Sequence, residues 1–179
     1  MRAGDALALE GPNGSGKTSL LRAVAGFLEP RGGTIRLRTN DGATLEGEER
    51  ARFIGWLGHQ DGAKSQMTPL EALAFFARFY GGAARIEDAL SRVGLARLRN
   101  LPIQYLSAGQ KRRLALARLT LAERPLWLLD EPLAALDKAG KALAAELIAQ
   151  HCKSGGLALV ATHEALGIDC GRLTLGNAS

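Results

Sequence analysis

Two kinds of hydrophobic pattern run along this chain, and each predicts a different kind of element. Stretches in which apolar residues alternate with polar ones, or follow one another without interruption, predict β-strands. The stretches at 125–132 and 156–163 are almost wholly apolar, which is typical of strands buried on both faces of a parallel sheet. The pattern predicts strands at residues 5–10, 34–38, 53–59, 125–132, 156–163 and 172–175, the last of them at a sheet edge.

Apolar residues that recur every three or four positions predict helices between these strands. Leu20, Val24 and Phe27 share one face of a helix over 17–27, which begins directly after a glycine-rich segment. A longer helix is predicted over 138–152, between the two apolar strands near the C-terminus. Strands that alternate with helices in this way favour an α/β fold with a parallel sheet.

The middle of the chain has a different character, because residues 67–118 are predominantly helical in pattern. Thr68 is in the N-cap position, Pro69 at the first helical position, and Glu71 completes a capping box. Two glycines end this helix, and a shorter helix is predicted over 85–93. We therefore expect a helical segment inserted between α/β segments.

Length and composition limit the overall organisation. A chain of 179 residues, 46% of them hydrophobic, is able to bury a core and is not a disordered chain. We expect one domain, in which residues 1–66 and 119–179 form the α/β core and residues 67–118 the helical subdomain. The formal net charge is +5, but the basic residues are spread out and their longest run is 111–113. We therefore expect no nucleic acid partner.

The cysteines and the hydrophobic runs bear on the location of the protein. Cys152 and Cys170 have no CxxC or zinc-ligand spacing, so we expect free thiols, as in a reducing cytosol. No signal peptide is visible, and no apolar run approaches the ~20 residues that span a bilayer. If the protein works at a membrane, another subunit has to hold it there.

Residues 11–18, GPNGSGKT, fit the pattern G-x-x-x-x-G-K-[ST] of a phosphate-binding loop. The loop follows a predicted strand and opens a predicted helix, so its N–H groups and the positive end of that helix make a cradle for phosphates. The Lys17 ammonium supplies a charge for the β- and γ-phosphates, and the Thr18 hydroxyl is a Mg²⁺ ligand. A glycine-rich turn that fits by accident is the alternative, and the context argues against it. We expect nucleotide binding by Gly11, Pro12, Asn13, Gly14, Ser15, Gly16, Lys17 and Thr18.

Two carboxylates end the apolar strand at 125–132. Asp130 would lie beside the phosphate loop, where its oxygens suit Mg²⁺, bound through water. Glu131 stands just past the end of the strand, where it could act as general base for an attacking water molecule. An acidic pair that caps a helix is the structural alternative, and the preceding phosphate loop makes it the weaker one.

Residues 106–110, LSAGQ, mark the start of another helix. Ser107 at the N-cap and Gln110 three residues later form a capping box. Such a helix N-terminus is also a second site for an anion.

These motifs together resemble those of the ATP-binding subunits of ABC transporters, and the resemblance covers nearly the whole chain. Residues 11–18 are similar to the Walker A motif and WLLDEP, residues 127–132, to Walker B. LSAGQ is similar to the family signature LSGGQ, with Ala108 in place of a glycine. Gln60, Asp137 and His163 stand where the family has its Q-loop, D-loop and switch histidine.

The resemblance implies a P-loop NTPase fold with a RecA-like parallel-sheet core and an inserted helical subdomain. It also implies ATP and Mg²⁺ as cofactors, and a second ATPase subunit packed head to tail. ATP would lie between the Walker A loop of one subunit and Ser107, Gly109 and Gln110 of the other. His163 would hold the γ-phosphate and the attacking water. Gln60 would contact Mg²⁺ and signal to integral membrane permease subunits.

A closer resemblance within the family concerns residues 57–62 with Lys64, and Thr68, Pro69 and Glu71. With LSAGQ and its basic continuation, they look like the ATPase of the bacterial haem exporter of cytochrome c maturation. That resemblance implies an enzyme coupling ATP hydrolysis to transport at the cytoplasmic face of the inner membrane, with a haem-chaperone apparatus among its partners. An ABC exporter for another substrate and a soluble, non-transport ABC ATPase remain the alternatives.

The N-terminus departs from the family pattern. ABC ATPases normally carry two more strands before Walker A, with an aromatic residue that stacks on adenine. Only ten residues precede the loop here, and the first aromatic residue is Phe27. We therefore expect one of two explanations: either the start site is misassigned, or the protein is truncated, lacks these two strands and the stacking residue, and binds adenine weakly.

Overall fold

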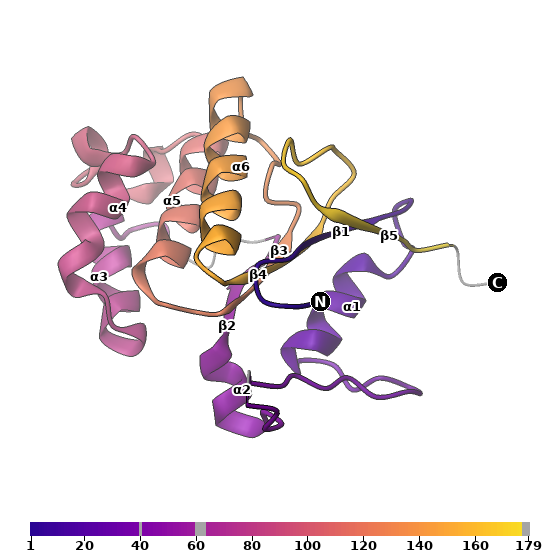
Figure 1. Ribbon diagram of the computed structural model, residues 1–179. Helices are drawn as coiled ribbons and strands as arrows, with labels where there is room; N and C mark the ends of the chain where they lie inside the picture. Colours follow the sequence, from indigo (N-terminus) through magenta and orange to yellow (C-terminus); the bar gives the residue numbers. More distant parts are fainter. Residues whose placement is uncertain (40, 60–63, 177–179) are drawn as a thin grey trace.

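A sheet of parallel strands forms the centre of the molecule (Figure 1). Within residues 1–39, 41–59 and 64–176, which this computed structural model describes, five strands pair in the order β2-β3-β4-β1-β5. All four pairings are parallel, so the carboxyl ends of the strands share one edge of the sheet. The strands are β1 (Ala6–Glu10), β2 (Ile54–Leu57), β3 (Leu126–Asp130), β4 (Leu157–Ala161) and β5 (Gly171–Thr174).

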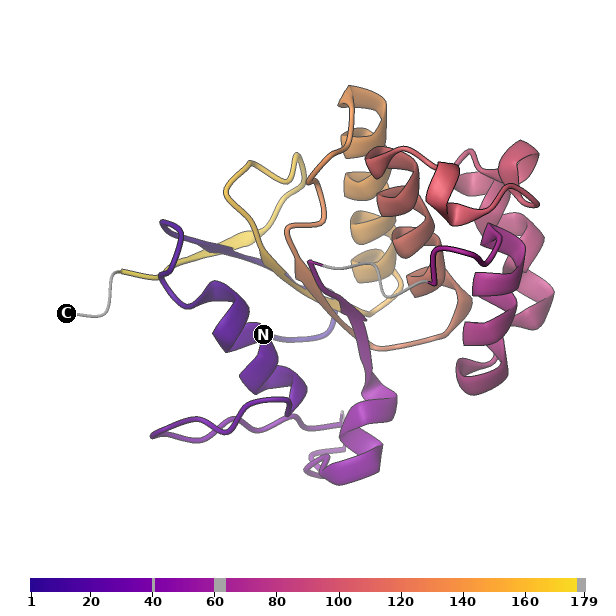
Figure 2. The ribbon, with the colours of Figure 1, turned by 180° about the vertical axis from the view of Figure 1, so that it is seen from behind.

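Helices cover both faces of this sheet (Figures 1 and 2). Helix α1 (Lys17–Ala25) lies on one face, and α5 (Ala108–Leu121) and α6 (Lys138–Lys153) lie on the other. Each face has its own apolar cluster, with Leu21 on the α1 side and Leu116 on the α5 side both fully buried. The fold is therefore the α/β parallel-sheet core that the sequence predicts.

A second group of helices packs beside the sheet and has a separate apolar core. It consists of α3 (Pro69–Tyr80), α4 (Ile86–Arg92) and one side of α5, with short 3₁₀ turns at Ala83–Arg85, Ala96–Leu98 and Ile103–Tyr105. Helix α5 belongs to both cores. Its residues Ala115, Leu116 and Leu119 face the sheet, whereas Leu114, Ala117 and Leu121 face α3 and α4.

The capping box predicted at the start of α3 is present. The Glu71 N–H donates to Thr68 Oγ1 at 3.2 Å, and the Thr68 N–H donates to Glu71 Oε2 at 2.8 Å. Pro69 lies in the first turn, where its missing N–H costs nothing. The local sequence therefore fixes where this helix begins.

The most apolar strand and the predicted edge strand both lie where the sequence pattern predicts them. Every residue of β3 is buried, as expected for a strand that is covered on both faces. Strand β5 lies at the edge of the sheet, beside β1, and all four of its residues are exposed. The continuously apolar runs thus became the interior strands of the sheet.

The prediction of a strand at residues 34–38 is wrong. This segment forms only an isolated antiparallel bridge between Arg38 and Thr44, within a short hairpin. The hydrogen bond from the Leu45 N–H to the Leu37 carbonyl, 2.9 Å long, continues the hairpin, but no described strand of the sheet lies beside it. Alternation of side chains predicted an extended segment correctly, but a strand also requires a partner.

The sequence pattern also missed a helix, α2 (Gly47–Phe53), directly before β2. Its first turn carries Glu48 and Glu49, and its last turn carries Arg50 and Arg52, the charge order that suits a helix dipole. None of its residues is buried, so no apolar periodicity exists to reveal it. The charge order was the available signal.

Candidate functional site

The glycine-rich loop joins the carboxyl end of β1 to the start of α1, at the edge where all the parallel strands end. Gly11 leaves β1 at φ 147°. A Cβ at this position would lie 2.4 Å from the Leu175 carbonyl oxygen. Only glycine therefore lets the loop leave the strand so close to the segment that follows β5.

The loop is open on the side where a ligand would bind. Gly14 and Gly16 have φ values of 83° and 94°, and a Cβ on either would meet nothing within 4 Å. No described side chain caps the N-terminus of α1, whereas Thr68, Ser107 and Asp137 cap α3, α5 and α6. The Ser15 hydroxyl is buried and has no hydrogen-bond partner among the described residues. Free N–H groups at a helix N-terminus and an unsatisfied hydroxyl fit a bound phosphate.

The Lys17 side chain folds back over the loop. It is 7% exposed, and its Nζ donates to the carbonyl oxygens of Gly11 at 2.7 Å and Pro12 at 3.0 Å. Both partners are neutral carbonyl groups, so neither carries a negative charge that would pair with the ammonium. The site can therefore accept an anion at this point.

Thr18 and Asp130 come together from segments 112 residues apart. The Thr18 hydroxyl lies 3.1 Å from Asp130 Oδ1 and 3.0 Å from Oδ2, and the Asp130 side chain is 5% exposed. A hydroxyl beside a carboxylate offers the hard oxygen ligands that Mg²⁺ prefers. The donor set at the end of β3 thus fits a magnesium ion that is shared with a bound phosphate.

Glu131 and His163 form a pair at the same edge of the sheet. His163 Nδ1 lies 2.8 Å from Glu131 Oε2; the imidazole is 61% exposed and the carboxylate 19% exposed. Glu131 has φ 50°, a left-handed conformation that is uncommon for a residue with a side chain. The turn at the end of β3 aims this carboxylate across the strand ends toward the loop after β4.

The residues of the LSAGQ segment lie elsewhere, at the start of α5. The Gln110 N–H donates to Ser107 Oγ at 3.2 Å, and the Ser107 N–H donates to Gln110 Oε1 at 2.9 Å, which is the capping box predicted. A Cβ on Gly109 would lie 2.9 Å from the Ala135 carbonyl oxygen, so the second glycine of the motif is sterically required. A hollow of about 530 Å³ is lined by Ser107, Gly109, Gln110, Ala135 and Asp137.

Asp137 serves as the N-cap of α6, a role that the sequence analysis did not assign. Its Oδ1 accepts the Gly140 N–H at 2.8 Å and the Arg113 guanidinium at 2.8 Å. The Gly140 N–H and then the Arg113 side chain hold the pKa of Asp137 below its usual value. The signal was available, because an aspartate directly before a predicted helix is a typical N-cap.

The predicted residues therefore form two groups in one chain. The glycine-rich loop, Asp130, Glu131 and His163 share the edge of the sheet. Ser107, Gly109, Gln110 and Asp137 line the separate hollow. Gln60 lies outside the described residues.

Arg112 connects these two groups and was missed by the sequence analysis. It lies on α5, is 4% exposed, and donates to the carbonyl oxygens of Asp130 and Glu131, which lie before and after the Glu131 Cα atom. In the sequence it is one of three consecutive basic residues. Its helical phase with Leu116, which is fully buried, was the only signal that it faces the core.

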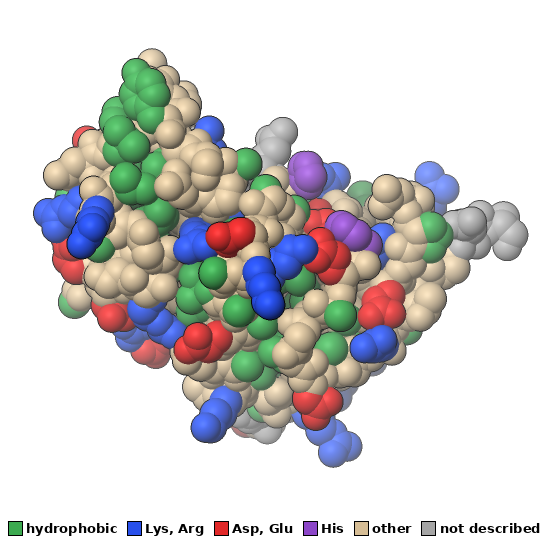
Figure 3. All heavy atoms as spheres, turned by 90° about the horizontal axis from the view of Figure 1, so that it is seen from above, with side chains coloured by type: hydrophobic (Ala, Val, Ile, Leu, Met, Phe, Trp, Pro, Cys, Tyr) green, Lys and Arg blue, Asp and Glu red, His purple; other side chains and the backbone are tan. Residues whose placement is uncertain are grey.

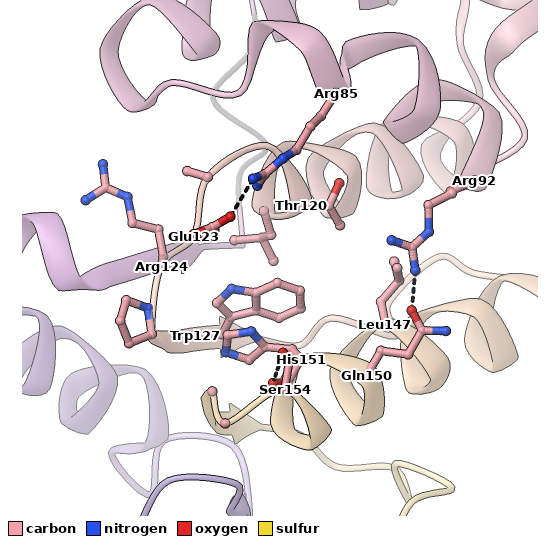
Figure 4. Close-up of a pocket in the computed structure, with 15 residues that line it drawn as sticks. Arg85, Arg92, Thr120, Glu123, Arg124, Trp127, Leu147, Gln150, His151 and Ser154 are labelled. Carbon is pink, nitrogen blue, oxygen red and sulfur yellow. Dashed lines mark hydrogen bonds and ion pairs between the residues drawn. The ribbon is translucent and has the colours of Figure 1, made fainter. Parts of the chain in front are cut away.

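A further hollow, of about 600 Å³, lies at the opposite end of the sheet from the glycine-rich loop (Figure 4). Its floor is Trp127, whose ring stacks on that of His151 with centroids 4.0 Å apart and planes at 5°. Burial lowers the pKa of His151. The polar side chains at the rim pair with one another, Arg85 with Glu123 and Arg92 with Gln150. These contacts explain the hollow as a structural junction between α4, α5 and α6.

No group of three or more His, Cys, Asp or Glu side chains converges to hold a metal ion within residues 1–39, 41–59 and 64–176. In the same part of the chain, no helix is long and apolar enough to cross a bilayer.

Comparison with known proteins identifies relatives of this chain. The family described as "ABC transporter" matches residues 1–134. The cytochrome c biogenesis ATP-binding export protein CcmA of Bradyrhizobium diazoefficiens is 49% identical over 175 residues, which are 97% of this chain and 85% of that protein. The protein of the same name in Nitrobacter winogradskyi is 48% identical over 177 residues, covering 98% of this chain and 86% of that protein.

Solved structures with the same fold support the same grouping. The ATP-binding subunit of an ABC transporter matches with a TM-score of 0.80 and 27% identity, over 90% of this chain and 69% of that one. A dimeric ATP-binding cassette in a post-hydrolysis state, bound to ADP and Pi, matches with a TM-score of 0.77 and 25% identity. That match covers 92% of this chain and 77% of the other.

Proposed function

Because the chain belongs to the ABC transporter family of ATP-binding proteins, we propose that it is the ATP-hydrolysing subunit of a membrane complex in c-type cytochrome biogenesis. The carrying observation is the convergence of the glycine-rich loop, Asp130, Glu131 and His163 at one edge of the sheet. The two relatives at 48–49% identity, both cytochrome c biogenesis ATP-binding export proteins, support the cytochrome c assignment.

In the proposed reaction, a water molecule attacks the γ-phosphorus of ATP. The new P–O bond forms as the bond to the β,γ-bridging oxygen breaks, and ADP leaves. Glu131 accepts the proton of the water, and His163, 2.8 Å away, orients that carboxylate and contacts the γ-phosphate. The loop N–H groups and Lys17 stabilise the phosphate charge. Catalysis is thus mainly positioning and electrostatics.

Mg²⁺ belongs to this proposal. Thr18 and Asp130 would hold it, with Gln60 from outside the described residues. It would neutralise charge on the β- and γ-phosphates. Thr18 and Asp130 offer one hydroxyl and one carboxylate, so substrate phosphates and water would complete the ligands of the ion.

We infer a head-to-tail pair of copies as the active form. Ser107, Gly109, Gln110 and Asp137 line a hollow of their own and do not belong to the edge that carries Glu131. A second copy would supply them to the nucleotide, which needs N–H donors on the side away from the loop. The dimeric architecture of a structural relative supports this arrangement.

Within each copy, residues 67–118 would move as a subdomain relative to residues 1–66 and 119–179.

The proposed partners are integral membrane permease subunits, and the location is the cytoplasmic face of the bacterial inner membrane. A groove of about 560 Å³ between the core and the helical group is lined by aromatic side chains, including Phe27, Trp56, Phe79 and Tyr80. Phe27 and Phe79 are 66% and 69% exposed, although they are large and apolar. We call these four residues the aromatic groove and propose that it receives a segment of the permease.

Two alternatives remain. An ABC exporter for another substrate would use the same site, and only the membrane partner would differ. A soluble ABC ATPase that acts on DNA or ribosomes is the second alternative. On the face in Figure 3, acidic and basic side chains are interspersed among the described residues, so that face carries no continuous basic surface.

Under the cytochrome c assignment, a haem-chaperone apparatus is a further proposed partner.

The test is capture with Glu131→Gln, which keeps nucleotide binding but removes the general base. We expect turnover to fall by at least about a hundredfold, since general-base catalysis contributes about 10²–10⁴. Tagged variant protein is purified from solubilised membranes with ATP present, and its partners are identified by mass spectrometry. Multi-span subunits with a haem-chaperone apparatus are the expected partners, and another permease would overturn the cytochrome c assignment. Hydrolysis at the parent rate would remove Glu131 from the role of base.

A further inference from the structure

Arg112 is a buried cation whose described contacts converge on the backbone at the catalytic end of the sheet. Its Nη2 donates to the carbonyl oxygens of Asp130 and Glu131, both at 2.6 Å. Its Nη1 donates to the carbonyl oxygen of Gly58 at 2.9 Å, just past the end of β2. One planar guanidinium thus joins the ends of two neighbouring strands, β2 and β3.

The segment that Arg112 holds is conformationally demanding. Glu131 has φ 50°, and the next turn is closed by the Ala134 N–H, which donates to the Glu131 carbonyl at 3.1 Å. A left-handed residue with a side chain costs of order 1–3 kcal/mol and persists only when its surroundings hold it. Short hydrogen bonds from a charged donor to the carbonyls before and after this residue supply such support.

The other end of the connection is the LSAGQ helix. Arg112 is four residues after Ala108, the first residue of α5, whose N-cap is Ser107. On the same helix, Gly109 packs against the Ala135 carbonyl, four residues after Glu131. The N-terminal turn of α5 and the turn that carries Glu131 are therefore coupled through a side chain and a backbone contact.

We propose that Arg112 is a positioning residue for ATP hydrolysis, which holds the Glu131 turn in its active conformation and makes it follow the N-terminal turn of α5. The inference rests on the proposed function, in which Glu131 is the general base and Ser107 and Gly109 bind the γ-phosphate of the partner copy. A nucleotide that engages the start of α5 in one copy would thereby set the carboxylate of that copy's own site.

Both the charge and the shape of the guanidinium are needed for this role. A lysine ammonium keeps the charge but lacks the planar fork that lets one side chain donate in fixed directions. Glutamine keeps one NH₂ group, with two N–H donors on a single nitrogen, but lacks the charge. We therefore expect Arg112→Lys and Arg112→Gln to share one defect, with kcat reduced about tenfold to a hundredfold, the loss that a misplaced catalytic group causes. The Kd for ATP should change less than about twofold, because the phosphate loop is intact.

The experiment measures kcat, KM and ATP affinity of the purified full chain and its variants, with hydrogen exchange of the peptide that spans residues 128–136. Faster exchange in this peptide, together with lower kcat and unchanged Kd, is the expected result for both Arg112 variants. Adding Arg112→Gln to Glu131→Gln should lower the residual rate no further, because the side chain acts through Glu131. The proposal would be overturned if the double variant lost kcat by the product of the two separate losses. Full activity in Arg112→Lys would also overturn it.

Arg50→Gln is the matched control. Arg50 also donates from Nε and Nη2 to backbone carbonyls of another segment, those of Ala23 and Val24 at 2.7–3.2 Å. It caps the end of α1 and lies away from Glu131, so kcat and the exchange of 128–136 should match the parent. Equal kcat losses in Arg50→Gln and Arg112→Gln would show a general stability effect. If Glu131→Gln itself retains full turnover, the proposed function fails, whereas the exchange measurement still decides whether Arg112 holds the turn.

Discussion

At the scale of one residue, the Lys17 side chain is held by its neighbours in a position where it can bind an anionic ligand. Its ammonium is nearly buried and bonds only neutral carbonyls among the described contacts. Lys17→Ala should weaken ATP binding by about tenfold to a hundredfold, since a hydrogen bond from a charged donor contributes about 1.5–3 kcal/mol. Titration calorimetry measures this, with Lys153→Ala on the exposed end of α6 as the control. Equal affinities in the two variants would contradict the assignment.

His151 makes the stability of the fold depend on pH. Burial against Trp127 lowers the pKa of His151, so the unfolded chain takes up a proton at higher pH than the folded chain does. This contribution is fully present above the unfolded pKa of about 6.5 and is lost as the pH falls below it. Melting temperatures between about pH 7.5 and 5.5 should therefore fall less steeply in His151→Gln than in the parent.

The comparison for this prediction is Ser154→Ala, which removes a hydroxyl that donates to the His151 carbonyl at 2.8 Å and does not titrate in this range. Its melting temperature should change with pH in parallel with that of the parent over the same range. Parallel curves for His151→Gln and the parent would show that the stacked imidazole titrates as it does in the unfolded chain.

The residues that we propose for phosphate binding could be named from the sequence because the chemistry of such a loop is local. The loop from Gly11 to Thr18 needs only its own sequence and a strand and helix on either side. Arg112 was not predictable, because its role depends on which carbonyls the end of β3 presents to α5. No spacing along the chain encodes that contact.

Two helices of this molecule begin with the same capping box, which allows a controlled comparison at the scale of elements. Thr68 caps α3 and Ser107 caps α5, and each oxygen accepts an N–H at 3.2 Å. Removing either oxygen should cost about 1 kcal/mol, a shift of roughly 2–4 °C in Tm for a chain of this size. Only Ser107→Ala should also reduce ATP turnover, because only this cap belongs to the proposed nucleotide site.

Calorimetry and a phosphate-release assay on Thr68→Ala and Ser107→Ala check this prediction. Similar Tm values with different turnover would separate the two roles of Ser107. Equal turnover in the two variants would leave its hydroxyl with a structural role alone.

Elements with a strong local signal were predicted, and elements that depend on neighbours were not. The continuous apolar sequence of β3 and β4 predicts these buried strands, and the capping box predicts the start of α3. The segment 34–38 has the alternation of a strand, but the sheet offers it no partner. Helix α2 has no buried residue, so its existence depends on charge order and chain connection alone.

At the scale of the whole molecule, the aromatic groove predicts how the chain joins a membrane complex. Phe79→Ser should leave the fold, ATP affinity and hydrolysis of the purified chain near the parent values, because the ring is 69% exposed. Co-purification with multi-span subunits should fall at least about tenfold, as expected for a large aromatic anchor at an interface. Capture from membranes followed by mass spectrometry measures the loss.

Leu173→Ser provides the control for this prediction. Leu173 lies on β5, is 43% exposed, and is remote from the aromatic groove. Its recovery of partners should equal that of the parent. Undiminished recovery with Phe79→Ser would place the permease contact on another face.

The order of strands in the sheet has a consequence for the synthesis of the protein. Strand β1 and the glycine-rich loop leave the ribosome before β4 and β5, but β1 pairs with both of these strands, whose residues are about 150 positions later. The closing of such long loops makes pairing late and slow. A growing chain therefore cannot complete the sheet edge that carries the proposed nucleotide site until β4 and β5 have been translated, and local pairing of neighbouring segments cannot form that edge earlier.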